Sequence, residues 1–170
     1  MEKSGLSDFE EIFGIMEQSF PTDERRKKEE QKALFSTEEY KVFTRRRDGR
    51  IIAFIAVWDF EDFLYVEHFA VSEKMRGGGI GAEMLKEIIH GFKKPICLEV
   101  EPPVTDTAIR RIAFYERNGM FLNNYDYIQP PLSKGQNSLP LLIMTSGGKI
   151  DRERFEGIKD TLYKKVYNVI

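Results

Sequence analysis

A strand–helix–strand pattern in the middle of the chain constrains the fold most. Residues 63–71 have the aromatic and β-branched composition of a strand, and a polar, glycine-rich loop follows at 72–81. Residues 80–91 then carry apolar side chains at helical spacing, and 96–101 is a strand of the buried type. Two strands joined through a helix run parallel and have a right-handed crossover. The pattern therefore predicts at least one parallel strand pair.

The preceding residues indicate antiparallel pairing. Strand-like runs at 41–46 and 51–58 flank the turn 47–50, which contains Asp48 and Gly49. Asp-Gly favours a type I′ turn, because both central residues need positive φ. Helices are predicted at 6–20, 23–35, 105–118 and 151–170, and two last strands at 120–127 and 139–145. The fold class is α+β, with a mixed sheet.

Length and charge exclude several classes of protein. The chain has 170 residues, with 26 Lys and Arg against 28 Asp and Glu, and a formal net charge of −2. One domain spanning residues 1–170 is expected, because this length buries roughly 70% of the unfolded chain's surface. Duplex-binding proteins show a basic excess, so nucleic acid is not expected as a partner.

Localisation follows from what the sequence lacks. The longest apolar run, 51–58, is far below the ~20 residues that span a bilayer, and the N-terminus has no apolar signal-peptide core. The single cysteine, Cys97, excludes an intrachain disulfide and a cysteine-based zinc site. We expect a soluble cytoplasmic protein without a metal site or a membrane partner.

The glycine-rich loop predicts a phosphate-binding site. Arg76-Gly77-Gly78-Gly79-Ile80-Gly81 lies between a strand and a helix. Glycines allow backbone N–H groups to form a concavity, and the helix N-terminus adds roughly half a positive charge. Phosphate is the natural ligand of such a site, and Arg76 can pair with a further phosphate oxygen.

A dinucleotide site is the weaker alternative for this loop. Gly77-x-Gly79-x-x-Ala82 satisfies the loose dinucleotide fingerprint, and Glu99 or Glu101 follows at a suitable distance. However, residues 72–76 separate the strand from the first glycine, where a dinucleotide site turns almost at once. No second βαβ unit follows either. An NAD(P)-binding domain is therefore the less favoured interpretation.

Two motifs resemble one known family. Residues 71–81 are similar to the acetyl-coenzyme A motif of the GNAT N-acetyltransferases, Arg/Gln-x-x-Gly-x-Gly/Ala, which Arg76, Gly79 and Gly81 match. Residues 114–120 resemble the second motif, Tyr-Glu-x-x-Gly-Phe, with Met120 in place of the phenylalanine. The resemblance implies a GNAT-like fold, whose central mixed, mostly antiparallel, twisted sheet has about six or seven strands flanked by helices.

The resemblance also implies a reaction. A GNAT enzyme transfers the acetyl group of acetyl-CoA directly to a primary amine, here of a small molecule or a peptide, and acts as a monomer or homodimer. A non-catalytic acyl-CoA-binding or regulatory module on the same fold is the alternative. The cofactor-binding residues implied are Phe69, Ala70, Val71, Arg76, Gly77, Gly78, Gly79, Ile80, Gly81, Ala82 and, by a looser argument, Arg111.

Acetyl transfer to an amine requires a base and an acid. A lysine-like amine has a pKa near 10.4, so its deprotonation at pH 7 costs about 4–5 kcal/mol. A carboxylate accepts that proton, directly or through water. The resemblance assigns this role to Glu67 or Glu99, with Glu67 slightly preferred. It assigns protonation of the departing thiolate to Tyr115.

Strand alternation separates the neighbours of these candidates. In a regular strand Tyr65, Glu67 and Phe69 share one face, and His68 points to the other. His68 is therefore expected to be structural. His90 at a helix end and Cys97 within an apolar strand are also interpreted as structural residues.

Overall fold

The computed structural model describes residues 1–169. The chain forms two compact units, Met1–Ile96 and Cys97–Ile170. The expectation of a single domain over the whole chain stays a prediction. None of the helices within residues 1–169 is long and apolar enough to cross a membrane.

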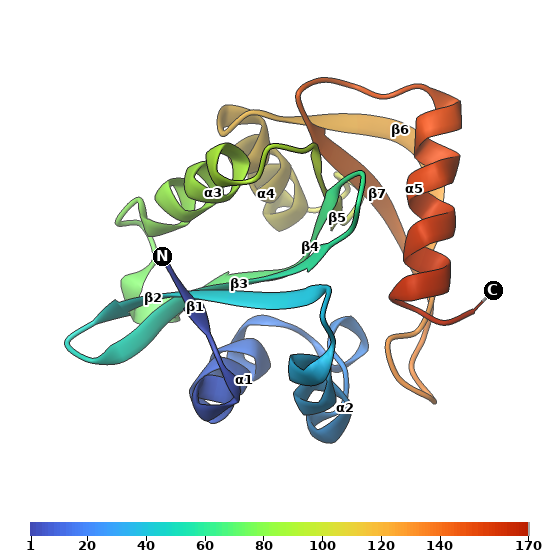
Figure 1. Ribbon diagram of the computed structural model, residues 1–170. Helices are drawn as coiled ribbons and strands as arrows, with labels where there is room; N and C mark the ends of the chain where they lie inside the picture. Colours follow the sequence, from blue (N-terminus) through green and yellow to red (C-terminus); the bar gives the residue numbers. More distant parts are fainter. Residues whose placement is uncertain (170) are drawn as a thin grey trace. The chain divides into compact units, whose positions relative to one another are not determined.

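The first unit is an antiparallel sheet between helices. Its strands are β1 (Glu2–Ser4), β2 (Tyr40–Arg47), β3 (Arg50–Asp59) and β4 (Leu64–Val71), and each pairs with the next. Helices α1 (Phe9–Ser19) and α2 (Lys28–Ala33) cover one face, and α3 (Ile80–Gly91) covers the other (Figure 1). Short 3₁₀ helices lie at Leu6–Asp8, Thr22–Glu24, Leu34–Ser36 and Glu73–Met75.

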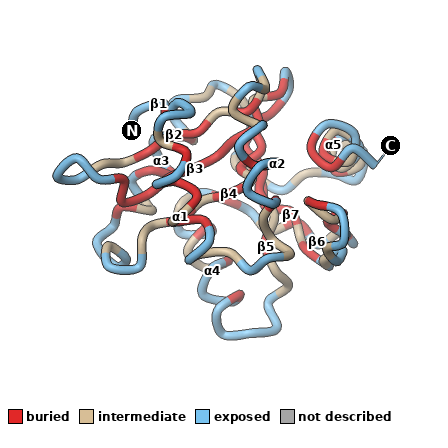
Figure 2. The backbone as a smooth tube through the Cα atoms, turned by 90° about the horizontal axis from the view of Figure 1, so that it is seen from below, coloured by how far each residue is buried: buried red, intermediate tan, exposed pale blue. Residues whose placement is uncertain are grey.

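The β2–β3 hairpin forms as the sequence predicts. Asp48 has φ +50° and Gly49 has φ +77°, which are the left-handed conformations that a type I′ turn requires. Residues 51–58 of β3 are all buried, because α1 packs on one side of the strand and α3 on the other (Figure 2). This two-sided burial explains the continuous apolar run in a strand whose pairing is antiparallel.

The predicted helix at 23–35 is wrong in its first half. A 3₁₀ turn at Thr22–Glu24 is followed by extended backbone at Arg25, with φ −144° and ψ 151°, and α2 begins only at Lys28. The extended segment lets Arg26, which is 5% exposed, point into the protein. A charged run that looked like a solvated helix thus supplies a buried side chain.

The start of β4 is hydrogen-bonded to the residue that precedes β5 (Ile96–Val100). The backbone N–H of Leu64 donates to the carbonyl of Pro95 over 2.9 Å. Pro95 directly precedes β5, and α3 lies between the two strands in the chain. This order is that of the predicted strand–helix–strand crossover.

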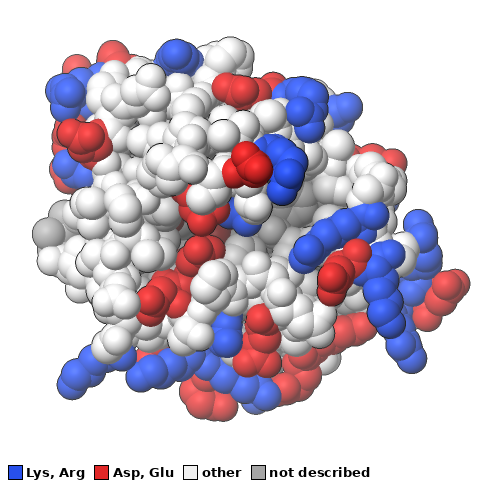
Figure 3. Space-filling model, turned by 180° about the vertical axis from the view of Figure 1, so that it is seen from behind, with Lys and Arg blue, Asp and Glu red and all other residues white. Residues whose placement is uncertain are grey.

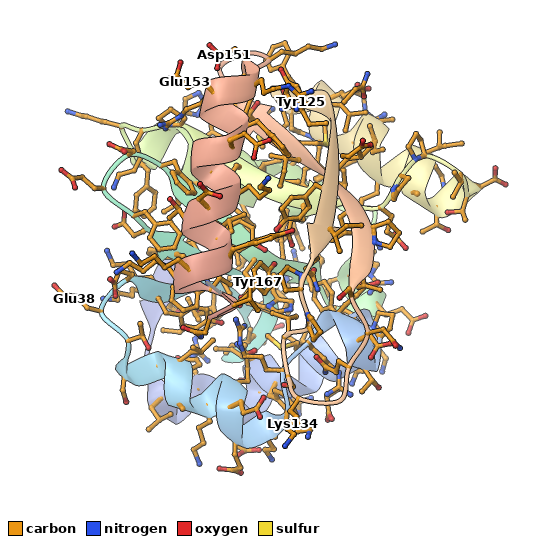
Figure 4. All side chains as sticks on the ribbon, turned by 90° about the vertical axis from the view of Figure 1, so that its right-hand side faces the viewer. Glu38, Tyr125, Lys134, Asp151, Glu153 and Tyr167 are labelled. Atoms are coloured by element: carbon orange, nitrogen blue, oxygen red, sulfur yellow. The ribbon has the colours of Figure 1, made fainter. Side chains whose placement is uncertain are left out.

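The second unit has its own antiparallel sheet. Strand β7 (Leu139–Ser146) pairs with β5 on one side and with β6 (Met120–Gln129) on the other. Thr105 caps α4 (Asp106–Arg117) by accepting from the N–H of Ala108 at 3.1 Å, and Asp151 caps α5 (Arg152–Lys165) by accepting from Arg154 at 2.8 Å. Helix α5 ends at Lys165, five residues before the predicted end at residue 170. Figure 4 shows Asp151 at one end of this helix and Tyr167 beyond the other.

Candidate functional site

The glycine loop has the geometry of an anion cradle. Gly77 and Gly79 have φ values of +83° and +80°, and Gly79 is the N-cap of α3 without a side-chain cap. The first N–H groups of the helix therefore have no partner from a capping side chain and lie beside an exposed loop. This arrangement can bind a phosphate group.

The side chains around the loop fit that use. Arg76 is exposed, and its Nε donates to the Val71 carbonyl at 3.0 Å, which fixes the side chain beside the end of β4. Its terminal nitrogens have no protein partner among residues 1–169. Phe69, Ala70 and Val71 end the same strand, and Ile80, 8% exposed, anchors the helix start. The predicted cofactor residues 69–71 thus lie at the end of β4, and residues 76–82 form the loop that follows and the first turn of α3.

Arg111 lies on α4, in the second unit. The Nη1 atom of Arg111 donates to Glu101 Oε2 at 2.8 Å, and the two side chains are 41% and 40% exposed. Its role toward phosphate stays a prediction.

Strand β4 contains a β-bulge at Glu67. His68 pairs with Ala56 of β3 and Val66 pairs with Val57, so Glu67 has no partner on β3. An extra residue interrupts the alternation of side chains between the two faces. The expectation that His68 points away from Glu67 is therefore wrong: His68 Nδ1 lies 3.4 Å from Glu67 Oε2.

Glu67 is a buried, ionised carboxylate. Its side chain is 2% exposed, and Oε1 accepts a hydrogen bond from Arg26 Nη1 at 2.7 Å. Burial alone would raise the pKa of Glu67, but the charges of Arg26 and His68 outweigh it and lower the pKa to about 2. The charge of Glu67 is thus stable at neutral pH.

Aromatic and amide side chains enclose this ion pair. The Arg26 guanidinium lies 6.0 Å from the ring centre of Trp58, which packs edge-on against Tyr40 at 5.4 Å. The Tyr40 hydroxyl accepts from Gln31 Nε2 at 2.7 Å. Burial and the Glu67 charge raise the pKa of Tyr40, so its hydroxyl stays neutral. Sequence reasoning missed Arg26 and Gln31, because both lie in a run of mixed charge typical of a solvated helix.

Glu99, in the second unit, is held by two tyrosines. Tyr127 donates to Oε1, and the Tyr167 hydroxyl lies 2.8 Å from both carboxylate oxygens. Burial, then the Glu99 charge, raises the pKa of Tyr127, and the same two causes raise the pKa of Cys97. Cys97 is fully buried, as its interpretation as a structural residue implies.

Tyr115 lies on the buried side of α4 but keeps an unpaired hydroxyl. Its side chain is 9% exposed and packs edge-on against Phe114 at 5.3 Å. Burial raises the pKa of Tyr115 to about 12, against a smaller lowering by Arg111. Within residues 1–169 its hydroxyl has no hydrogen-bond partner. A neutral, uncommitted O–H is what a proton donor requires.

Two observations describe the titratable side chains elsewhere in the described part of the chain. Across residues 1–169 no group of three His, Cys, Asp or Glu side chains is placed to hold a metal ion. Figure 3 shows acidic and basic side chains mixed over the face that it presents. This face therefore has no continuous basic surface.

Comparison with known proteins identifies the family. The sequence model of the Acetyltransferase (GNAT) family matches residues 8–120. The chain belongs to the GNAT acetyltransferase family. The match includes the glycine loop, the β4 bulge and all of α4.

Relatives support this assignment over the whole chain. A GNAT-family acetyltransferase structure from Bacteroides thetaiotaomicron is 37% identical, covers 99% of this chain and 98% of its own, and superimposes with a TM-score of 0.91. The Bacillus subtilis (strain 168) protein YjbC, named as an acetyltransferase, is 28% identical over 87% of this chain and 77% of its own length. The predicted GNAT fold class is confirmed.

A more distant structure agrees in fold alone. The ribosomal-protein-S18-alanine N-acetyltransferase of Escherichia coli is 18% identical, covers 89% of this chain and 95% of its own, and has a TM-score of 0.64. At this identity the likeness describes the architecture and not the acceptor.

Proposed function

We propose that this GNAT acetyltransferase transfers the acetyl group of acetyl-CoA directly to a primary amine of a small molecule or peptide. The observation that carries the proposal is the glycine loop at the N-terminus of α3, with Arg76 fixed beside it. Pyrophosphate is the anionic part of coenzyme A, and a helix N-terminus binds such a group through backbone N–H groups. Phe69, Ala70 and Val71 then line the strand end next to the cofactor.

A carboxylate serves as general base in this proposal. Glu67 is preferred because it lies on β4, the strand that leads into the glycine loop. Its charge also attracts an ammonium group, the form in which a primary amine occurs at neutral pH. Glu99 is the second candidate, but its two oxygens already accept from Tyr127 and Tyr167.

Tyr115 serves as general acid. The thiolate of coenzyme A needs a proton as the C–S bond breaks, and a tyrosine with a pKa of about 12 carries one at every physiological pH. Its hydroxyl makes no hydrogen bond to another described residue, so none has to be broken.

Ligand-induced stabilisation tests the cofactor. Acetyl-CoA at 100 times its Kd should stabilise the protein by about 2.7 kcal/mol, whereas NAD and ATP should not. Gly79→Val should abolish the effect. Gly49→Val is the matched control: Gly49 has nearly the same φ, +77° against +80°, and added Cβ atoms meet no heavy atom within 4 Å at either position. Stabilisation by NAD alone, or an equal loss in both variants, would refute this placement of the cofactor.

Turnover tests the reaction. A panel of small amines and peptides should release free thiol from acetyl-CoA with at least one member. The second candidate function, a non-catalytic acyl-CoA-binding module, is favoured by one observation: both candidate bases already pair with protein groups. Acetyl-CoA binding without thiol release from any amine would select that module and reject the enzyme.

A further inference from the structure

Glu67 is a buried carboxylate with one oxygen bound and the other unpaired. Oε1 accepts a hydrogen bond from Arg26 Nη1 at 2.7 Å, whereas Oε2 has no hydrogen-bond partner within residues 1–169. His68 Nδ1 lies 3.4 Å from Oε2, but this contact does not have the geometry of a hydrogen bond. Buried polar atoms are nearly always satisfied, so the unpaired oxygen indicates a donor from outside the chain.

Two other carboxylates with several partners use both of their oxygens. In the first unit, Asp59 Oδ1 accepts from Lys94 and Asp59 Oδ2 accepts from Lys41. In the second unit, Glu99 has a tyrosine hydroxyl partner at each oxygen. A carboxylate that only holds a fold together can satisfy both oxygens in this way. Glu67 satisfies one, which distinguishes it from these structural carboxylates.

Arg26 determines which oxygen of Glu67 is occupied. A guanidinium group is planar and presents its N–H donors in fixed directions, so a hydrogen bond from it orients the carboxylate that accepts it. The Arg26 and Glu67 side chains are 6% and 2% exposed, so water hardly competes for this bond. The carboxylate is therefore held in one orientation, with Oε1 toward Arg26.

The surrounding side chains hold Arg26 in turn. Its guanidinium carbon lies 6.0 Å from the ring centre of Trp58, which packs against Tyr40 at 5.4 Å and against Phe60 at 6.1 Å. Gln31 Nε2 donates to the Tyr40 hydroxyl at 2.7 Å. Trp58, Tyr40 and Gln31 come from β3, β2 and α2 respectively. Side chains from three elements thus support the arginine that orients Glu67.

We propose that Arg26 is a positioning residue for acetyl transfer: it holds Oε1 of Glu67, so that Oε2 is kept for the ammonium group of the acceptor amine, directly or through one water molecule. This inference rests on the proposed function and assigns a role to a residue outside the two sequence motifs. An ammonium group carries a positive charge and N–H donors, which are what an ionised, unpaired oxygen attracts. Without Arg26 the carboxylate would have no fixed orientation toward the amine.

Steady-state kinetics test this role with an amine that wild type acetylates. Arg26→Met is unbranched like arginine but leaves Glu67 Oε1 without its donor. The value of kcat/KM for the amine should fall at least about 10-fold, while the KM for acetyl-CoA stays within about two-fold, because the glycine loop is unchanged. An unchanged kcat/KM for the amine would overturn the proposal.

Arg46→Met is the matched control. Arg46 belongs to the same unit and donates to Glu2 and Asp8 at 2.6 and 2.7 Å, but its side chain is 31% exposed. Removing these exposed ion pairs should leave kcat/KM for the amine and the KM for acetyl-CoA as in wild type. An equal loss of kcat/KM in Arg46→Met and Arg26→Met would overturn the proposal, because the effect would then follow from any lost ion pair.

Cofactor binding separates positioning from structural support. Acetyl-CoA at about 100 times its Kd should raise the Tm of Arg26→Met by as much as that of wild type. Loss of this shift together with the loss of turnover would show that Arg26 only supports the fold, and would overturn the proposal.

Arg26→Lys decides the question where Arg26→Met does not fold. Lysine keeps the positive charge that Glu67 requires but lacks the planar group that orients the carboxylate. We expect Arg26→Lys to fold and to have a kcat/KM for the amine at least about three-fold below wild type, with the KM for acetyl-CoA unchanged. A wild-type kcat/KM in Arg26→Lys would overturn the proposal.

This proposal and the proposed function fail in different ways. If wild type acetylates an amine and the Arg26 variants do so equally well, the positioning role is refuted and the proposed function stands. If wild type binds acetyl-CoA but acetylates no amine, the proposed function is refuted, and the positioning role that rests on it is refuted as well.

Discussion

The buried Arg26–Glu67 pair should make stability depend on pH in a calculable way. The pKa of Glu67 is about 2 in the folded protein against 4.5 for the unperturbed group. At 1.36 kcal/mol per pKa unit, this difference corresponds to about 3 kcal/mol of folding free energy. Because the folded pKa is the lower one, this stabilisation is complete above pH 4.5 and is lost as the pH falls toward 2.

The perturbation is Glu67→Gln, which preserves volume but leaves Arg26 buried without its counter-charge. At pH 7 the variant should be about 3–5 kcal/mol less stable than wild type, the usual cost of breaking a buried pair. By pH 3 the difference should shrink by about 2 kcal/mol, because wild type has lost that part of its advantage. Urea titrations at a series of pH values, followed by circular dichroism, give both free energies.

The exposed Arg111–Glu101 pair provides the control. Its N–O distance of 2.8 Å is close to the 2.7 Å of Arg26–Glu67, but its side chains are about two-fifths exposed, at 41% and 40%. Glu101→Gln should therefore cost less than about 1 kcal/mol at pH 7. If Glu67→Gln costs no more than Glu101→Gln, or if its cost is the same at pH 3 and pH 7, the reasoning from a buried ionised carboxylate is refuted.

Three further predictions concern the second unit. Tyr115→Phe should change the free energy of unfolding by less than about 0.5 kcal/mol, because the Tyr115 hydroxyl is unpaired among the described residues. The same variant should lower kcat about 100-fold. Equal losses of kcat and of acetyl-CoA affinity would make Tyr115 a packing residue. Tyr127→Phe should cost about 2 kcal/mol in a urea titration, since it removes a donor from the Glu99 carboxylate; an unchanged midpoint would contradict this, and Tyr167→Phe provides a second measurement of the same cluster. Thr105→Ala should lower stability by about 1 kcal/mol through loss of the α4 N-cap, and an unaltered midpoint would show that the cap contributes nothing.

Local signals in the sequence predicted most of the fold. Asp48-Gly49 specifies its hairpin through backbone conformation alone, and the glycine run before α3 specifies the loop in the same way. Amphipathic spacing located the buried faces of α1, α3 and α5, and Thr105 marked the start of α4. These features depend on residues that are neighbours in the chain.

The features that sequence reasoning missed depend on distant residues. Alternation along β4 assumes uninterrupted pairing, and the bulge at Glu67 exists only in register with β3. Arg26 lies 41 positions from Glu67 in the chain, and Tyr167 lies 68 positions from Glu99. No local pattern distinguishes these side chains from ordinary charged or helical residues. The sequence therefore identified Glu67 and Glu99 as candidate bases, but it did not predict the side chains that pair with them.

The packing of Trp58 beside Arg26 gives this protein a built-in optical probe. Trp58 is the single tryptophan of the chain, is 4% exposed, and lies 6.0 Å from the guanidinium carbon. Indole emission responds to nearby charge, so the fluorescence of the native protein originates from one defined neighbourhood. A change in wavelength or intensity on adding a cofactor or an amine would thus report a rearrangement around Trp58, where Arg26, Tyr40 and Phe60 pack, in unlabelled protein and on the timescale of stopped-flow mixing.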